Sequence, residues 1–159
     1  MENNKQAVFD KIINQLNQFY SKYNKNPELT ITAKMASLSS VLRMHFEDLK
    51  FVGFYIVQNA EEEYLEIGPY VSDFLATPKI GYGKGVCGTS WKEAKTIIIN
   101  NVSKCNNYIA CDEETQSEIV LPVIKDNKVI AVWDIDSINL DRFDEIDQNN
   151  LEYLIKNFI

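Results

Sequence analysis

Two predicted β-hairpins constrain the fold of this chain more than any other feature of its sequence. Segments 117–124 and 128–136 are rich in β-branched residues and flank Asp126-Asn127, a typical hairpin turn. Segments 51–58 and 63–69 form a second pair around a polar turn. The strands do not alternate regularly with long helices, which disfavours a doubly wound parallel sheet. The sequence therefore predicts an α+β domain with a central, mainly antiparallel sheet.

The remaining segments are predicted to be helices, one short strand and two long loops. Apolar periodicity and flanking breakers predict helices over 5–24, 28–49, 86–93 and 144–158, a strand at 95–100, and loops at 70–84 and 101–114. With helices packed on one face of the sheet, the other face is free for a pocket that the loops roof. We expect one domain over residues 1–159, with N-terminal helices in about 5–49, sheet and pocket in 51–137, and a C-terminal helix in about 144–158.

Composition excludes several kinds of partner. The 159 residues include 16 basic and 23 acidic side chains, for a net charge of −7, and no basic patch of the kind that nucleic acid requires. Apolar runs are too short to cross a bilayer, and the N-terminal segment lacks the pattern of an export signal. We therefore expect a cytoplasmic protein without nucleic-acid or membrane partners. A homodimer is compatible with a domain of this size.

The cysteines are the chain's best candidates for chemistry. There are three, Cys87, Cys105 and Cys111, and an odd number without an export signal favours free or redox-active thiols over a disulfide scaffold. The single histidine, His45, falls on the apolar stripe of a predicted helix, which favours a packing role. The absence of a CxxC pair and of further histidines argues against a metal site, so we expect none.

Strand alternation gathers aromatic and acidic side chains on one face of the sheet. That face carries Phe51, Tyr55, Glu118, Asp134 and Asp136. Two rings and three carboxylates would suit a small, cationic and partly apolar ligand. A solvated sheet face would show the same alternation, so the pattern alone leaves both interpretations open.

Several motifs occur together and in order along the chain. They are FVGFY (51–55), GYGKGVCGTS (81–90), IACDEETQSEIVLP (109–122), WDIDS (133–137) and RFDEID (142–147). In combination they resemble the free methionine-(R)-sulfoxide reductases, a GAF-domain family that reduces the sulfoxide of free methionine. The resemblance covers about residues 30–159 and implies a GAF-like fold.

The resemblance also implies roles for individual residues. Cys111 would be the nucleophile that attacks the sulfoxide sulfur, and Glu118 or Asp136 would be the acid that protonates its oxygen. The implied substrate-binding set comprises Phe51, Tyr55, Glu118, Asp134 and Asp136. The substrate carboxylate would meet backbone N–H groups near Gly85–Gly88, at the start of a helix.

The chain departs from the family at one position that matters for turnover. The family commonly has a resolving cysteine ten residues before the cysteine of GVCGT, and this chain has Thr77 there. Resolution of the Cys111 sulfenic acid would then fall to Cys87 first, to Cys105 second, or to an external thiol. The resemblance implies thioredoxin as reductant and no bound cofactor. The alternative to an enzyme is a non-catalytic GAF-type module that binds a small ligand or senses redox state.

Overall fold

One antiparallel sheet organises the part of the chain that the computed structural model describes, residues 2–59 and 61–159. Its strands are β1 (Leu49–Asn59), β2 (Glu63–Ser72), β3 (Lys79–Gly81), β4 (Ile97–Ile99), β5 (Ser117–Lys125) and β6 (Lys128–Ser137). The helices are α1 (Glu2–Tyr23), α2 (Ile31–His45), α3 (Gly85–Glu93) and α4 (Glu145–Phe158), with a short 3₁₀ turn η1 at Val102–Lys104. The strand order is β3-β2-β1-β6-β5-β4, with every neighbouring pair antiparallel. The predicted fold class is therefore confirmed.

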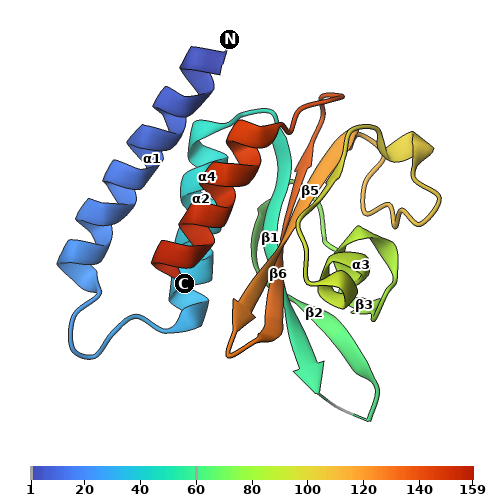
Figure 1. Cartoon of the computed structure of the whole chain (residues 1–159), viewed down its shortest axis with the longest axis horizontal. Helices are drawn as coiled ribbons and strands as arrows, with labels where there is room; N and C mark the ends of the chain where they lie inside the picture. The colour runs from blue at the N-terminus through green and yellow to red at the C-terminus, as the bar shows by residue number, and fades with distance from the viewer. Residues whose placement is uncertain (1, 60) are drawn as a thin grey trace.

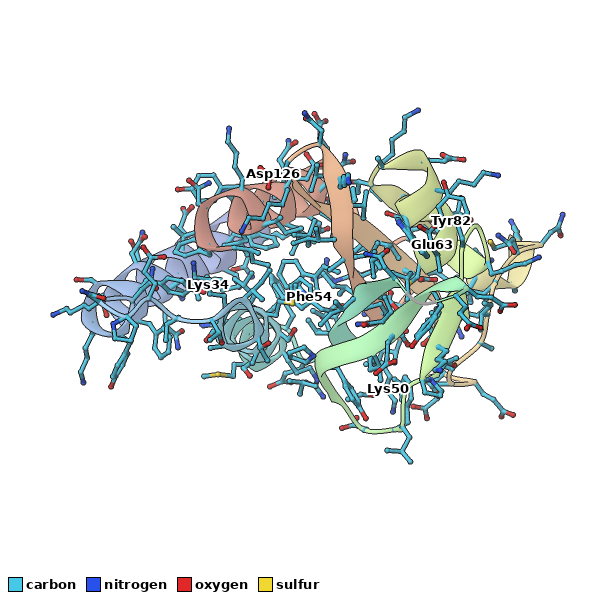
Figure 2. The ribbon with its side chains drawn as sticks, turned by 90° about the horizontal axis from the view of Figure 1, so that it is seen from below. Lys34, Lys50, Phe54, Glu63, Tyr82 and Asp126 are labelled. Carbon is cyan, nitrogen blue, oxygen red and sulfur yellow. The ribbon has the colours of Figure 1, made fainter. Side chains whose placement is uncertain are left out.

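Helices cover the two faces of the sheet unequally. The helices α1, α2 and α4 lie on one side, and α3 lies on the other beside the long loop between β4 and β5 (Figure 1). On the first side, Val52, Phe54 and Trp133 belong to the main apolar core. Figure 2 shows Phe54 pointing into the layer between the helices and the sheet. Its ring stacks on that of Trp133, with the two ring centroids 5.1 Å apart.

The second helix is shorter than the predicted range 28–49. It begins at Ile31 because Thr30 caps it, its Oγ1 accepting a hydrogen bond of 3.3 Å from the Ala33 N–H. It ends at His45, since the chain must extend by Leu49 to pair with Ser137 of β6. His45 itself contacts Gln15 of α1, with 2.9 Å between Nε2 and Oε1, so it lies in the helical layer.

The predicted loop at 70–84 is partly wrong. The second strand continues through Gly68-Pro69 to Ser72, and Lys79–Gly81 pairs with it as β3. The pairing register between β1 and β2 shifts between Gly53 and Tyr55, and this irregularity absorbs the Gly-Pro pair. Proline lacks a backbone N–H but is tolerated where a ladder is interrupted, so it does not end the strand.

The described helices do not include a candidate membrane span. Over residues 2–59 and 61–159, no helix combines the length and the apolar character that a membrane span requires.

Candidate active site

Three carboxyl groups meet on the sheet face opposite the main helices. Glu118 lies on β5 and pairs directly with Asp136 of β6, while Asp134 lies two residues further along the same face of β6. Their exposed fractions are 4%, 5% and 6% in that order, so all three are buried. We call Glu118, Asp134 and Asp136 the acid triad. The predicted gathering of these acids on one face is confirmed.

Each member of the acid triad has a carboxyl oxygen that lacks a hydrogen-bond partner among the described residues. Glu118 Oε2, Asp134 Oδ1 and Asp136 Oδ1 are buried without a hydrogen-bond partner among the described residues. Burying an ionised carboxylate without a partner is costly, which favours the protonated form. Burial accordingly raises the pKa of Glu118 and that of Asp136 well above their usual range. Burial also raises the pKa of Asp134 to about 6, against hydrogen bonds that lower it.

The carboxyl groups also affect one another through their charges. The charges of Asp134 and Asp136 add to burial in raising the pKa of Glu118. Glu118 therefore holds a proton in preference to Asp134, whose pKa is raised only to about 6. The site holds a carboxylic acid near neutral pH, which is the requirement for general acid catalysis.

The thiol of Cys111 faces the same cavity as the acids. Cys111 lies half-buried in the loop between β4 and β5, residues 100–116, which we call the roof loop. It lines a cavity of about 20 Å³ together with the acid triad and Cys87. A cavity of that size has room for about one water molecule. The Cys111 thiol and the acid triad thus lie around one small cavity that the roof loop closes.

The other two cysteines occupy different environments. Cys87 is the third residue of α3 and is buried, and burial together with Asp134 and Glu118 raises the pKa of its thiol well above the usual value. Cys105 is a half-buried residue of the roof loop itself and is not among the described residues that line the cavity. Cys87 therefore shares the cavity with Cys111, whereas Cys105 does not.

A set of side chains able to hold a metal ion overlaps this cavity. The ligand atoms of Cys87, Glu118 and Asp134 lie within 4.8 Å of one another. The lack of a CxxC pair in the sequence excludes only a metal site built from neighbouring residues. Here the three groups come from α3, β5 and β6, so no spacing in the sequence signals the cluster.

The two aromatic residues lie beneath the cavity rather than in its wall. Phe51 and Tyr55 are 2% and 0% exposed, and neither lines the cavity. The Phe51 ring stacks on Tyr70, with centroids 5.6 Å apart. The Tyr55 hydroxyl donates to the Thr77 carbonyl at 3.1 Å. Tyr55 thus supports the backbone at Thr77, and direct contact of either ring with a substrate stays a prediction.

Sequence reasoning missed Asn107, which fastens the roof loop to α3. Its Oδ1 accepts from the Gly85 N–H at 3.2 Å, and its Nδ2 donates to Thr89 Oγ1 at 3.1 Å. Gly85 has φ +61°, and a Cβ there would lie 2.8 Å from Ile109 Cδ1. The glycine-rich motif signalled a close approach of backbone segments. Nothing in the sequence signalled that Asn107 is the partner.

A larger hollow on the molecule lacks comparable chemistry. Its volume is about 740 Å³, and it lies between α4 and the outer ends of β5 and β6. Among the described residues that line it are no cysteine and no member of the acid triad. Size alone would favour this hollow, but only the small cavity combines a thiol with buried acids.

This architecture defines a class of protein. An antiparallel sheet with helices on one face and a roofed cavity on the other is the GAF arrangement, and residues 36–157 match the GAF domain family.

Comparison with characterised proteins narrows the class. The free methionine-R-sulfoxide reductase of Escherichia coli is 33% identical over 144 residues, covering 87% of this chain and 85% of that protein. The Saccharomyces cerevisiae protein of the same name is 44% identical over 110 residues, covering 69% and 61%. The structure of the Neisseria meningitidis free methionine-R-sulfoxide reductase in complex with its substrate superposes with a TM-score of 0.84 at 31% identity, covering 96% and 86%. The chain belongs to the free methionine-R-sulfoxide reductase family of GAF-domain proteins.

Proposed function

We propose that this protein reduces free L-methionine-(R)-sulfoxide to L-methionine, with Cys111 as the nucleophile. The observation that carries the proposal is the cavity in which the Cys111 thiol and the acid triad face each other. A sulfoxide sulfur becomes electrophilic when its oxygen is protonated, so the reaction needs a thiolate and an acid on the same substrate. This cavity supplies both.

The reduction step uses one thiolate and one proton. The Cys111 thiolate forms a bond to the sulfoxide sulfur while Glu118 delivers its proton to the oxygen. Asp136, whose pKa burial also raises, is the second candidate for the acid. The sulfur–oxygen bond then breaks as the protonated oxygen passes to the Cys111 sulfur, and the transient bond between the two sulfurs breaks with its electron pair left on the methionine sulfur. The products are methionine and a Cys111 sulfenic acid, so the substrate gains the two electrons that the cysteine loses.

Substrate binding requires the roof loop to open. The closed cavity of about 20 Å³ is far smaller than the roughly 300 Å³ at the lower end of ligand pockets. Once the loop opens, the carboxylates of Asp134 and Asp136 are placed to pair with the substrate ammonium. The first residues of α3, Gly85–Cys87, line the cavity and suit the substrate carboxylate, because the N-terminus of a helix favours negative charge.

Cys87 is the proposed resolving residue. Its thiol attacks the sulfenic acid of Cys111, a disulfide forms and water leaves. Thioredoxin or another dithiol then reduces that disulfide and is itself oxidised. Support comes from the position of Cys87 on the wall of the same cavity, which Cys105 does not share. A reducing, cytoplasmic location fits this cycle, since all three thiols are free.

The test is turnover measured separately with the two sulfoxide epimers. With dithiothreitol as reductant, the wild type should convert the R epimer of free methionine sulfoxide and leave the S epimer unchanged. The Cys111→Ser variant should lose all measurable turnover, because serine is a far weaker nucleophile. Undiminished turnover by this variant would contradict the proposal.

Two further readouts separate the steps. After one equivalent of the R epimer without reductant, peptide mapping should find Cys87 bonded to Cys111. A Cys105–Cys111 disulfide instead would make Cys105 the resolving residue. Calorimetric binding of a small metabolite without any sulfoxide turnover would favour the non-catalytic sensing module.

A further inference from the structure

We propose that Thr77 is a positioning residue whose hydroxyl stabilises the thiolate of Cys111. The Thr77 Oγ1 lies 3.0 Å from the Cys111 Sγ, within hydrogen-bonding distance. A hydroxyl beside an ionised sulfur can only donate, and a hydrogen bond to the charged form of a group favours that form. This inference rests on the proposed role of Cys111 as nucleophile.

Two hydrogen bonds hold the backbone at Thr77 and at the residue that follows it. Its carbonyl accepts a hydrogen bond of 3.1 Å from the buried Tyr55 hydroxyl. The carbonyl of the next residue, Pro78, accepts from the Ile67 N–H of β2 at 3.1 Å. A residue before proline is also restricted to extended conformations. The hydroxyl is therefore presented to Cys111 by a supported segment, which reduces the entropy lost in making the contact.

The charges around Cys111 explain why such a donor matters. The titratable groups that face it are the acid triad from β5 and β6, Cys87 from α3, Tyr55 from β1 and Tyr108 from the roof loop. The roof loop also carries Asp112, the residue next to Cys111 in the sequence. None of the described residues lining the cavity is Lys, Arg or His. The ammonium of Lys50, on the neighbouring part of β1, pairs with Glu114 and Asp73. Stabilisation of a thiolate here must come from neutral donors, and Thr77 is positioned as one.

The decisive measurement is the pH dependence of Cys111 alkylation, which requires no substrate. Iodoacetamide labelling of the Cys111 peptide, followed by mass spectrometry, reports the fraction of ionised thiol at each pH. Thr77→Val removes the hydroxyl and keeps the branched shape. We expect its alkylation midpoint to rise by about one pH unit, the tenfold change typical of losing a hydrogen bond to a charged group. Thr77→Ser keeps the hydroxyl and should hold the midpoint near that of the wild type.

A matched control separates this effect from a general one. Thr96→Val makes the same chemical change at a hydroxyl that donates to Glu152, outside the cavity. Its alkylation midpoint should equal that of the wild type. Equal midpoints for Thr77→Val and the wild type, or equal shifts in Thr77→Val and Thr77→Ser, would overturn the proposal. Thermal unfolding of each variant establishes that the compared proteins are folded.

Turnover distinguishes this inference from the proposed function. With the R epimer at pH 7, Thr77→Val should be about tenfold slower than the wild type, and the deficit should shrink as pH rises past the new midpoint. If no protein turns over the sulfoxide but the alkylation midpoint shifts as expected, the proposed function fails and the role of Thr77 stands. If the sulfoxide is reduced and the Cys111 alkylation midpoint does not move, the proposed function stands and the role of Thr77 fails.

Discussion

The same strands build two sheet faces of opposite chemistry. Under α2 and α4, the side chains of Val52, Phe54 and Trp133 are completely buried in an apolar layer. On the other face, the buried positions include Glu118 and Asp134, beneath α3 and the roof loop. Burial of apolar groups stabilises the fold, whereas burial of unpaired carboxyl groups costs free energy. One face therefore maintains the fold, and the other holds a reactive arrangement at the expense of stability.

Mutations on the two faces should therefore affect different properties of the protein. Truncation on the helix face should lower stability, because it leaves a cavity in a packed core. Replacing an acid on the cavity face with its amide should lower activity while leaving stability equal or higher, because the amide cannot ionise inside the protein.

The largest effect is expected on the helix face. Phe54→Ala removes a completely buried ring that stacks on Trp133 and should lower the free energy of unfolding by about 3–5 kcal/mol. Urea unfolding followed by tryptophan fluorescence measures it. Phe19→Ala, at a position of α1 that is 38% exposed, is the control and should cost less than about 1 kcal/mol. Similar losses in both variants would erase the distinction between core and surface.

The next effect concerns catalysis on the cavity face. Glu118→Gln keeps the shape but removes the acid, so the rate of sulfoxide reduction should fall by about 100-fold or more. The free energy of unfolding should stay equal or rise. Glu152→Gln, on α4, makes the same change outside the cavity and should keep its activity. Full activity in Glu118→Gln would transfer the role of acid to Asp136.

The third prediction uses pH to expose the cost of the buried acids. Burial raises the pKa of Asp134 from its ordinary value of 3.8 to about 6. Between those values the folded state binds more protons than the unfolded state, so stability falls as pH rises. Asparagine does not titrate, so the Asp134→Asn variant should not lose stability in this way as pH rises. Its free energy of unfolding minus that of the wild type should therefore grow by about 2 kcal/mol between pH 4 and pH 7. A difference that is constant over this range would contradict the raised pKa.

The smallest effect concerns the backbone that closes the cavity. Gly85→Ala forces a side chain onto φ +61° and pushes its Cβ toward Ile109, so stability should fall by about 1–2 kcal/mol. The disturbed roof loop should also make Cys111 react faster with iodoacetamide. Gly81→Ala has a closest contact of 3.3 Å, to the flexible Lys84 side chain, and serves as the control. Equal alkylation rates in both variants would show that Gly85 does not hold the loop.

Local patterns predicted most of this fold. The hairpin at Asp126-Asn127 and the helix over 144–158 lie within a residue or two of their observed positions, because turn chemistry and apolar periodicity act over short distances. The failures occurred where a distant partner decided the outcome. Lys79–Gly81 became a strand because β2 was available to pair with it, and β2 passed through Gly68-Pro69 because β1 is irregular opposite them.

The candidate site, like the fold, was predictable from local sequence patterns only in part. Alternation along β5 and β6 was enough to place the acid triad on one face, since neighbouring side chains of a strand must point to opposite sides. Alternation could not reveal whether that face is exposed to solvent or buried. Only the packing of α3 and the roof loop shows that the acids are buried, unpaired and therefore raised in pKa.

The sequence by itself determined the antiparallel hairpins and the sidedness of their residues, because both depend on neighbours within a few positions along the chain. Tertiary structure alone decided which hydroxyl touches the Cys111 thiol, and which side chain fastens the roof loop to α3. Thr77 and Cys111 are 34 residues apart, and Asn107 and Gly85 are 22 apart, so their contacts exist only once the sheet has brought the segments together. Reactivity in this protein depends on those distant contacts, since the local dielectric and the hydrogen-bond donors around a group set its protonation.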